Sequence, residues 1–434
     1  MHYTRFGCKR DFCRRSNAPA LGSERVVRIL IVSQYYPPEA APIPGDLARE
    51  LADRGHSVRV LTGYPNYPQG KVFSGYRQRW RGHEQDGRVV VCRVPLYADH
   101  SHSPTKRILN YISFALSAAT ASKVSRDADI VYVYATQMTA AFGPWLWRLA
   151  GGRPYVLHVQ DLWPDSIIGS SMMSGDKRGR LVARVLGPWI RSVYRRAAAV
   201  VGIAPTMVST LISRGVRADS AHLIYNWADA GGSSDALPPP SHRASRAEVV
   251  YAGNVGDMQD LETAVRAVHA AADAGVSLTI VGDGVARETL RELVTELGAP
   301  NIRFEDPVSR ERMPEIYAKA DYALVSLKDM PVFHGTIPSK FQAVLAAGVP
   351  VITTVQGDVR AIVDETHVGF TVDAENVDAL AATFRAAAAL TSGEREEMSL
   401  RGRELYDTKF SRESGITRIE EVLAEAVKGK WNAR

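Results

Sequence analysis

Residues 332–354 read VFHGTIPSKFQAVLAAGVPVITT and specify a loop, a helix and a strand in succession. The loop contains Gly335, and residues 340–347 are mostly good helix formers. Gly348 and Pro350 are typical of a helix end, and the VITT that closes the stretch is a β-branched run typical of a buried strand. This order predicts half of a βαβ unit, and with it a parallel sheet.

The start of the predicted helix has two notable features. Ser339 and Gln342 have the spacing of a capping box, in which side chains satisfy the first free amides. Lys340 lies in the first turn, where the helix dipole favours anions rather than cations. A helix N-terminus with a nearby lysine forms a phosphate site, and Gly335 lets the backbone approach a ligand closely. The alternative is that Lys340 simply extends into water, and this stretch alone does not decide between the two.

The bulk properties restrict the class of protein. The 434 residues exceed one ordinary core and predict two domains, and 45% hydrophobic with 23% charged residues is a globular composition. The net charge of +6 suits an acidic partner: a nucleotide, a nucleic acid or an anionic membrane. Three cysteines are too few for a disulfide framework, which favours a reducing cytoplasm. No apolar run reaches about 18 residues and no signal peptide is evident, so we expect neither a membrane span nor export.

The first half of the chain predicts a Rossmann-like domain over residues 26–230. Residues 1–25 are polar and basic, and we interpret them as a disordered tail. An apolar strand at 26–32 is followed by a long loop to Gly45, a helix at 46–54 and a strand at 58–61. Long loops at the carboxyl ends of parallel strands are where ligands bind. A GxGxxG fingerprint is missing from this unit, which disfavours a dehydrogenase.

Further α/β units continue to the end of the chain. The sequence predicts strands at 130–134, 155–159, 200–203, 222–227, 249–253, 278–284, 302–304, 322–327, 351–354 and 369–372. Residues 231–247 are rich in Gly, Ser and Pro and read as a linker before a second Rossmann-like domain at 248–411. A last helix within 412–434 can pack back across the domains. The predicted fold is α/β, with two doubly wound domains facing across a cleft, a favoured ligand site.

Two predicted helices are basic and amphipathic. In residues 177–196 an apolar stripe is surrounded by arginines, and the stripe contains Val182, Val185, Leu186, Trp189 and Val193. Residues 104–123 carry a similar stripe with Lys106 and Arg107 at its start. Such helices can lie on an anionic membrane, although both stripes can also be ordinary core faces. We favour the membrane for 177–196 and leave the choice open for 104–123.

Seven stretches together carry a family resemblance. They are SQYYPPE (33–39), HVQDLWPD (158–165), NW (226–227), YAGNVGDMQDLETAV (251–265), IVGDGVARETL (280–290), IYAKADYALVSL (316–327) and IPSKFQAVLAAGVPVI (337–352). On them, residues 28–410 resemble glycosyltransferase family 4, retaining enzymes of the two-domain GT-B fold. The nearest branch makes bacterial polysaccharides and includes the L-fucosamine transferases. No single stretch is specific to this family, but the seven stretches in this order are.

The resemblance implies transfer of a sugar from a nucleotide diphosphate donor, with retention, to a lipid-linked or saccharide acceptor in polysaccharide or glycolipid assembly. A UDP-linked N-acetylated amino sugar is the expected donor, with no cofactor, no metal and no nucleic acid. The donor would lie on the C-terminal domain, where Lys340 and its helix would hold the diphosphate. The implied donor residues are Gly253, Asn254, Gln259, Gly282, Asp283, Gly284, His334, Gly335, Thr336, Pro338, Ser339, Lys340 and Gln342.

The implied acceptor lies on the N-terminal domain. There His158 or Asp161, at a strand's carboxyl end, would orient the acceptor hydroxyl, although a His with a carboxylate three residues on can also be a structural pair. The acceptor-side residues of the first loop are Tyr36, Pro37 and Glu39.

The sequence departs from the family pattern in two places. Many members carry two glutamates separated by seven residues, but Gly335 and Ala343 occupy those positions here, with His334 and Gln342 as the nearest substitutes. Members also carry Arg and Lys after the first strand of the second domain, where this chain has Asn254 and Gln259. The expected donor site is therefore less basic, and more of the phosphate binding rests on Lys340.

Other functions compete with the transferase. A nucleotide-sugar epimerase of the same fold would carry acidic and basic catalytic residues in the cleft and no lipid-facing surface. A non-catalytic binding module for sugar nucleotides or nucleic acid suits the charge, but the arginines lack the interleaved aromatic platform that single strands favour. We therefore predict a cytoplasmic glycosyltransferase, peripheral at the inner face of the membrane.

Overall fold

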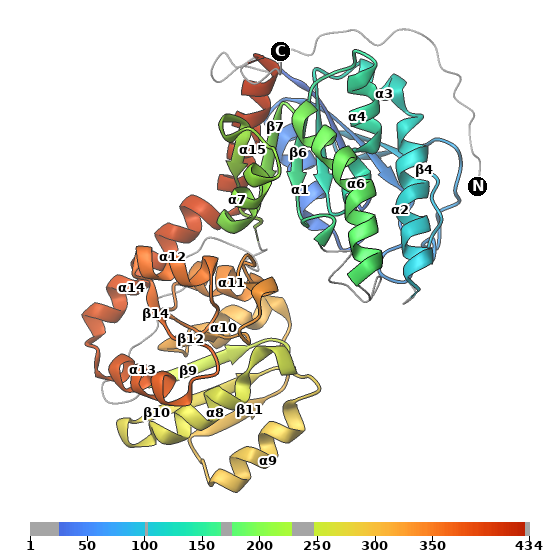
Figure 1. Cartoon of the computed structure of the whole chain (residues 1–434). Coiled ribbons are helices and arrows are strands. Elements are labelled where there is room, and N and C mark those ends of the chain that lie inside the picture. The colour runs from blue at the N-terminus through green and yellow to red at the C-terminus, as the bar shows by residue number, and fades with distance from the viewer. Residues whose placement is uncertain (1–25, 100–102, 166–175, 228–246, 430–434) are drawn as a thin grey trace, which may run out of the picture.

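The computed structural model describes residues 26–99, 103–165, 176–227 and 247–429, which form two α/β domains (Figure 1). The predicted tail at 1–25 and nearly all of the predicted linker lie outside the described residues. Ala247, the last residue assigned to that linker, is already the first residue of a strand.

The N-terminal domain is built on an eight-stranded sheet with the order β3-β4-β2-β1-β5-β6-β7-β8. All neighbouring strands are parallel except β3, which runs antiparallel to β4. The strands are β1 (Arg28–Ser33), β2 (Ser57–Gly63), β3 (Gly82–Asp86), β4 (Val89–Val94), β5 (Ile130–Ala135), β6 (Tyr155–Val159), β7 (Ala199–Gly202) and β8 (Ala221–Leu223). The helices are α1 (Pro42–Asp53), α2 (Pro104–Ala119), α3 (Ser122–Arg126), α4 (Phe142–Leu149), α6 (Asp176–Arg196) and α7 (Pro205–Ser213).

The C-terminal domain has a six-stranded, wholly parallel sheet with the order β11-β10-β9-β12-β13-β14. Its strands are β9 (Ala247–Ala252), β10 (Val276–Val281), β11 (Ile302–Glu305), β12 (Tyr322–Val325), β13 (Val351–Thr353) and β14 (Gly369–Thr371). Its helices are α8 (Leu261–Ala270), α9 (Arg287–Leu297), α10 (Met313–Tyr317), α11 (Ser339–Ala347), α12 (Asp358–Thr366), α13 (Val377–Ala389) and α14 (Ser392–Leu405). Single 3₁₀ turns lie at Met138–Ala141, Ala218–Ser220, Asp257–Gln259, Ala272–Ala274, Arg310–Arg312 and Pro331–Phe333.

The predicted loop, helix and strand within residues 332–354 are confirmed as the segment that leads through α11 into β13. Gly348 ends the helix in the left-handed conformation, with φ +66°, as a glycine C-cap does. Two doubly wound domains were the predicted architecture, and that prediction is confirmed.

The predictions for the first domain were wrong in two details. The helix predicted at 46–54 starts at Pro42, because a proline in the first turn costs no hydrogen bond and has a helical φ. The first loop is therefore shorter than expected. Strands β3 and β4 were missed because β3 is a polar edge strand without an apolar pattern and β4 contains a buried arginine, Arg93.

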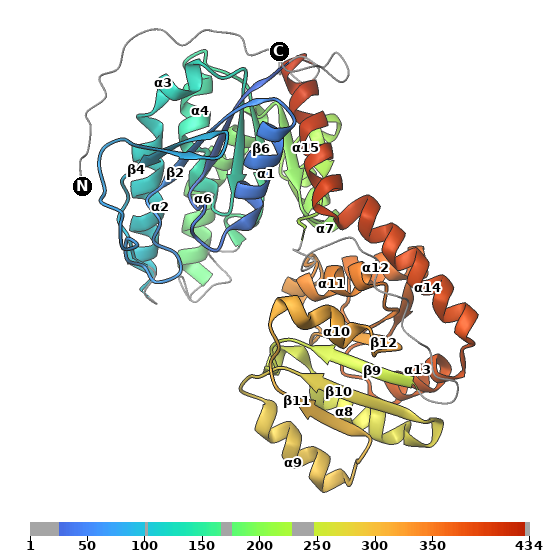
Figure 2. The same ribbon diagram turned by 180° about the vertical axis from the view of Figure 1, so that it is seen from behind.

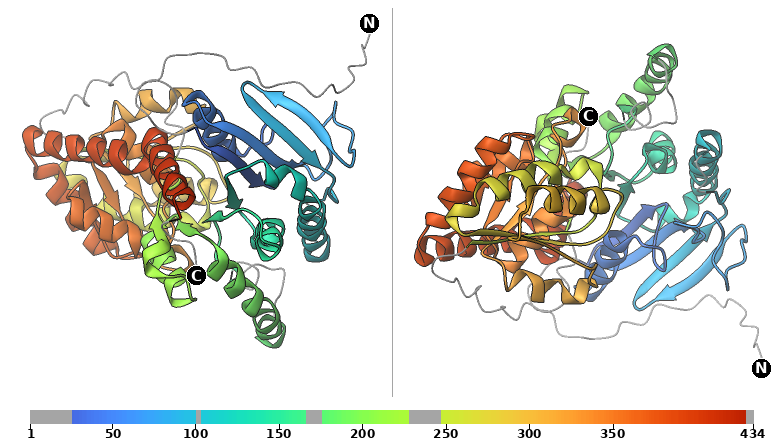
Figure 3. Two further views of the ribbon diagram at one scale, coloured as in Figure 1. Left: turned by 90° about the horizontal axis from the view of Figure 1, so that it is seen from above. Right: turned by 90° about the horizontal axis from the view of Figure 1, so that it is seen from below.

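The two faces of the N-terminal sheet have separate cores. One face is covered by α2, α4 and α6, and the other by α1 and the last helix of the chain (Figures 1 and 3). On α6, Leu186 and Trp189 pack against the first core and Val193 is completely buried. The prediction that this stripe lies on a membrane is therefore wrong for these three residues. They form a core face; the side chains of Val182 and Val185 lie outside the described set.

The chain returns to the N-terminal domain through a π-helical turn, Tyr406–Phe410, and α15 (Arg412–Val427). Ile416, Ile419 and Leu423 of α15 are buried in the same core as α1, beside which α15 runs in Figure 2. Glu420 lies 2.7 Å from both the Arg54 guanidinium and the His56 ring. Helix α15 is therefore a structural part of the first domain, although it follows the second in sequence.

We expect Leu423→Ala to lower the free energy of unfolding by about 2–5 kcal/mol, because it leaves a cavity between α15 and the first sheet. Leu400→Ala is the matched control, since Leu400 is 60% exposed on α14. Denaturant titration of both variants measures the difference. Equal, small losses would contradict the packing of α15.

Candidate active site

Two glycine-containing loops meet at the carboxyl edge of the C-terminal sheet. Gly282, after β10, has φ +141°, and a Cβ on it would lie 1.9 Å from the carbonyl oxygen of Gly253, after β9. A Cβ on Gly284 would similarly lie 2.2 Å from the Val255 carbonyl oxygen. The Val255 amide donates to the Asp283 carbonyl at 2.9 Å. These glycines are therefore required for the two loops to pack together, and this packing fixes the backbone that faces the implied donor.

Asn254 and Gln259 are the neutral residues at the two positions where the family resemblance implies basic ones. Both stabilise the loop after β9. The Gln259 side-chain oxygen accepts hydrogen bonds from the Asn254 amide at 3.0 Å and from the Gly256 backbone at 3.1 Å. Asp283 is exposed, and its carboxylate accepts from the Gly284 amide at 2.8 Å. The loops after β9 and β10 thus offer amides and one carboxylate but no cation from Asn254 or Gln259.

The predicted capping box at the start of α11 is wrong. The helix begins at Ser339, with Pro338 as N-cap and without a side-chain cap. Pro338 has φ −63° and ψ 139°, an extended conformation that suits the residue before a helix. This shifts the helix start by one residue, so Gln342 falls in the fourth position rather than the third and is buried. The first amides of α11 therefore have no side-chain partner from Ser339 or Gln342.

Lys340 turns inward rather than into water. Its ammonium donates a hydrogen bond to the Tyr251 hydroxyl and lies 3.9 Å from the centroid of that ring. The Tyr251 hydroxyl donates to the Asn254 carbonyl at 2.5 Å. A Cβ on Gly253 would lie 2.4 Å from Cε of Lys340, so the glycine makes room for the lysine. The start of α11 is thereby tied to the end of β9.

Burial lowers the pKa of Lys340 to about 8. Within the described residues, no carboxylate lies at ion-pair distance from its ammonium. An incompletely solvated cation without a counter-ion attracts an anion more strongly than an exposed lysine does. Lys340, the N-terminus of α11 without a side-chain cap and the β9 loop can therefore bind a phosphate.

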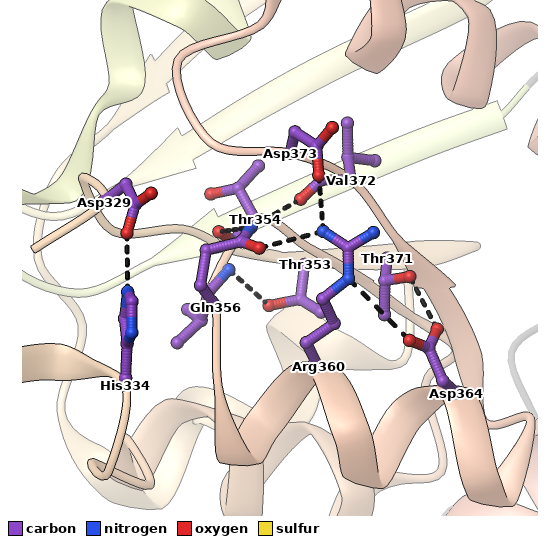
Figure 4. A network of polar contacts seen from close by, with 11 residues as sticks. Asp329, His334, Thr353, Thr354, Gln356, Arg360, Asp364, Thr371, Val372 and Asp373 are labelled. Atoms are coloured by element: carbon purple, nitrogen blue, oxygen red, sulfur yellow. Dashed lines mark hydrogen bonds and ion pairs between the residues drawn. The ribbon is translucent and has the colours of Figure 1, made fainter. Parts of the chain in front are cut away.

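His334, Gly335 and Thr336 lie on the loop before α11, at the side that faces the first domain. The His334 ring nitrogen Nε2 is 2.6 Å from the Asp329 carboxylate (Figure 4). The His334 carbonyl accepts from the Asp358 amide at 2.8 Å, and Gly357 is needed because a Cβ there would lie 2.2 Å from that carbonyl.

A network of polar contacts supports this loop from the β13 side. Gln356 donates to the carbonyls of Thr354 and Val372 at 2.9 Å, and Arg360 joins Gln356 to Asp373 (Figure 4). The loops that follow β12, β13 and β14 are therefore held together as one unit.

The same loop contacts the N-terminal domain. The Asp358 carboxylate, in the first turn of α12, accepts from the Thr206 amide at 3.0 Å and from its hydroxyl at 2.7 Å. Thr206 lies in the first turn of α7, and Gly335 packs beside it. A residue of the C-terminal domain thus caps helix α7 of the N-terminal domain. This contact could not be predicted from the sequence, because no local pattern relates two positions so far apart.

His158 is completely buried at the carboxyl end of β6. Its Nδ1 lies 2.5 Å from the Tyr132 hydroxyl, and its ring meets that of Tyr134 edge-on at 5.7 Å. Burial lowers its pKa to about 3, so the imidazole is neutral at pH 7 and a poor proton acceptor. Its Nε2 has no hydrogen-bond partner among the described residues. Asp161 is exposed, but nearby protein partly desolvates its carboxyl and raises its pKa.

The implied acceptor residues of the first loop are engaged within the domain. The buried Tyr36 donates to Asp86 at 2.8 Å, and the Pro37 carbonyl accepts from Arg93 at 2.6 Å. The buried Glu39 carboxylate accepts from the amides of three residues: Tyr36, Asn66 and Tyr67. Through these hydrogen bonds, Tyr36 and Glu39 hold the loop in its conformation. The structure therefore does not support direct contacts between these two side chains and an acceptor.

The structure divides the implied residues into two groups. Gly253, Asn254, Gln259, Gly282, Asp283, Gly284 and Lys340 gather around the loops after β9 and β10, whereas His334, Gly335 and Thr336 lie toward the first domain. Tyr251 and Arg93 were not predicted; each is a polar residue inside an apolar strand pattern, which hides its role. Among the described residues, no three His, Cys, Asp or Glu side chains group as a metal site requires.

We expect nucleotide affinity to fall as pH rises through about 8, because Lys340 then loses its charge. A diphosphate is already ionised there, since its last pKa is about 6. The free protein should gain stability between pH 8 and 10.5, where the unfolded chain still holds a proton that the folded Lys340 has released. Lys340→Met should abolish both trends. Calorimetric titration with UDP across this range measures the first, and an unchanged pH profile in the variant would contradict the assignment.

We expect Tyr251→Phe to weaken nucleotide binding by about five- to tenfold, because the ring remains but Lys340 loses its hydrogen-bond partner. Tyr322→Phe is the control, since it removes a similar buried hydroxyl, bonded to Ala387 at 2.7 Å, elsewhere in the sheet. Titrations should also show that Tyr251→Phe adds little to Lys340→Ala. Additive effects would mean that the tyrosine does not act through the lysine.

Comparison with known proteins identifies the family of this chain. Residues 40–227 match the family model described as a glycosyl transferase 4-like domain, and residues 246–389 match that of the glycosyl transferases group 1. The putative colanic acid biosynthesis glycosyl transferase WcaI of Escherichia coli is 30% identical over 83% of this chain and 92% of its own length. The 2-deoxystreptamine N-acetyl-D-glucosaminyltransferase of Streptomyces fradiae is 27% identical over 82% of this chain and 83% of its own.

Solved structures share the fold. HepE of Anabaena, in complex with UDP, has a TM-score of 0.61 at 16% identity and covers 92% of this chain and 100% of that one. Sucrose-phosphate synthase of Thermosynechococcus elongatus has a TM-score of 0.64 at 18% identity, covering 93% and 100%. With both domain models matched in order on two Rossmann-like domains, this chain belongs to the glycosyltransferases of the GT-B fold.

Proposed function

We propose that the enzyme transfers a sugar, with retention of the anomeric configuration, from a nucleotide diphosphate donor to a lipid-linked or saccharide acceptor in polysaccharide or glycolipid assembly. The observation that supports this best is Lys340, a partly buried cation at the start of α11 that has no carboxylate partner among the described residues. A UDP-linked N-acetylated amino sugar is the proposed donor. The UDP complex of HepE and the name of the Streptomyces relative are in line with it.

The chemistry requires stabilisation of a departing diphosphate. Lys340 and the free amides of α11 present fixed positive charge where the negative charge of the leaving group grows. Because Asn254 and Gln259 are neutral, the ammonium of Lys340 carries more of this stabilisation than in relatives with basic residues there. We propose that these protein groups act without a metal ion, so a chelator should leave the rate unchanged.

The acceptor hydroxyl must lose a proton. Since the pKa of His158 is about 3, His158 cannot hold that proton at pH 7. Its unpartnered Nε2 suits a hydrogen bond to a sugar hydroxyl instead. In this proposal the proton passes to the Asp161 carboxylate or to the departing diphosphate, and His158 orients a substrate.

Thermal unfolding with UDP, GDP and dTDP tests the donor site. At about 100 times its dissociation constant, the correct nucleotide should add roughly 2.7 kcal/mol of stability. The gain should be lost in Lys340→Ala and kept in Lys319→Ala, an exposed lysine at the opposite, amino edge of β12. Lack of response to every nucleotide would refute the donor site.

The anomeric proton of the product, followed by NMR from the first turnovers, tests retention. An inverted product would refute that part of the proposal and leave the transferase. Nucleotide binding without transfer to any lipid-linked or saccharide acceptor would favour a binding module instead.

A further inference from the structure

Helix α2 presents an apolar stripe to solvent. Leu109, Ile112 and Leu116 are 51%, 45% and 55% exposed, and their spacing of three and four residues places them on one face. The opposite face of α2 is in the core, where Phe114 and Ala118 are buried. Figures 1 and 3 show α2 at the outer edge of the helical layer that it forms with α4 and α6. Helix α2 therefore has two apolar faces, one packed in the core and the other exposed.

An exposed tryptophan extends this surface. The Arg81 guanidinium donates to the Thr120 hydroxyl, which places the loop of residues 77–81 beside the C-terminal end of α2. Trp80 in this loop is 62% exposed, and the Arg81 guanidinium lies 5.1 Å from the centroid of its ring. Tryptophan with neighbouring arginine is typical of membrane interfaces, where the ring sits among the headgroups.

The charged residues within the two segments that form this surface are all basic. Residues 70–81 and 104–123 contain no Asp or Glu, and their cations are Lys71, Arg77, Arg79, Arg81, Lys106, Arg107 and Lys123. Lys106 pairs with Asp99 at 3.4 Å, while Arg77 and Arg79 are exposed in the Trp80 loop. An anionic partner is therefore favoured on either side of the apolar residues.

We propose that this surface, defined by Leu109, Ile112, Leu116 and Trp80 with the cations of its two segments, docks the enzyme on an anionic lipid bilayer. The aliphatic side chains enter the boundary of headgroups and acyl chains, while the cations contact the headgroups. None of the described helices is both long and apolar enough to cross a bilayer, so the contact is on the surface. This inference rests on the proposed function in one respect, the reason for docking: at the bilayer, the first domain meets a lipid-linked acceptor.

A second copy of the chain is a poorer partner for this surface. A symmetric dimer would bring the same patch of each subunit together. It would then place the cations of residues 70–81 and 104–123 opposite one another, without described acidic residues in either segment to compensate. The charge pattern favours the bilayer.

Vesicle flotation tests the docking. The wild type should float with vesicles of phosphatidylcholine and phosphatidylglycerol, less with phosphatidylcholine alone, and less at high salt. Leu109→Ser with Leu116→Ser should reduce the bound fraction by about tenfold, because it removes two of the four exposed apolar side chains of this surface. Leu400→Ser, on the C-terminal domain, should float like the wild type. Failure of the wild type to float, or unchanged flotation of the double variant, would overturn the proposal.

Two controls separate this result from other causes. A concentration-dependent dimer that the double variant abolishes, without vesicle binding, would identify a second copy as the partner and refute the bilayer. The double variant should keep the wild-type response to UDP, because its substitutions lie outside the donor loops. Flotation of the wild type without any nucleotide response would thus support the docking surface and refute the proposed function. A nucleotide response without flotation would support the proposed function and refute the docking surface.

Discussion

The contact between Lys340 and Tyr251 connects the parts of this enzyme that the proposed chemistry uses. It joins the first turn of α11 to the end of β9, and Gly253 leaves the space in which the lysine stem lies. The lysine loses part of its hydration there, which lowers its pKa to about 8 and leaves a cation ready for an anion. Because the Tyr251 hydroxyl also holds the Asn254 carbonyl, the lysine and the β9 loop are positioned together.

The same helix reaches the junction between the domains. Phe341, next to Lys340, packs against Phe410 of the returning chain at 5.9 Å, and Phe410 packs against Tyr225 at 4.4 Å, close to where the chain leaves the first domain. Asp358 caps α7 of the first domain from the second. A change in the angle between the domains would therefore bear on α11 and on the loop of His334.

The proposed donor site contains few ionic groups. Asn254 and Gln259 bond to each other where relatives are expected to have cations, and the glycines at 253, 282 and 284 are used for loop packing. On the other side, His158 is neutral and Glu39 is satisfied by three backbone amides. Among the implied diphosphate contacts, positive charge thus comes from Lys340 and the N-terminus of α11.

The two-domain α/β architecture could be predicted from the amino-acid pattern, because buried parallel strands are continuous apolar runs, and glycine and proline mark helix ends as they do around Gly348 and Pro350. The pattern also pointed to Lys340, since a cation in a first helical turn contradicts the local preference. Which side chains meet depends instead on the packing of the elements in three dimensions. Leu186, Trp189 and Val193 of α6 face the core, whereas Leu109, Ile112 and Leu116 of α2 are exposed. Ser339 is inside the helix rather than its cap, and Asp358 reaches Thr206 across the domains. An amphipathic pattern indicates that one face of a helix is apolar, but not what covers that face. Contacts between residues distant in sequence depend on how whole helices and strands pack.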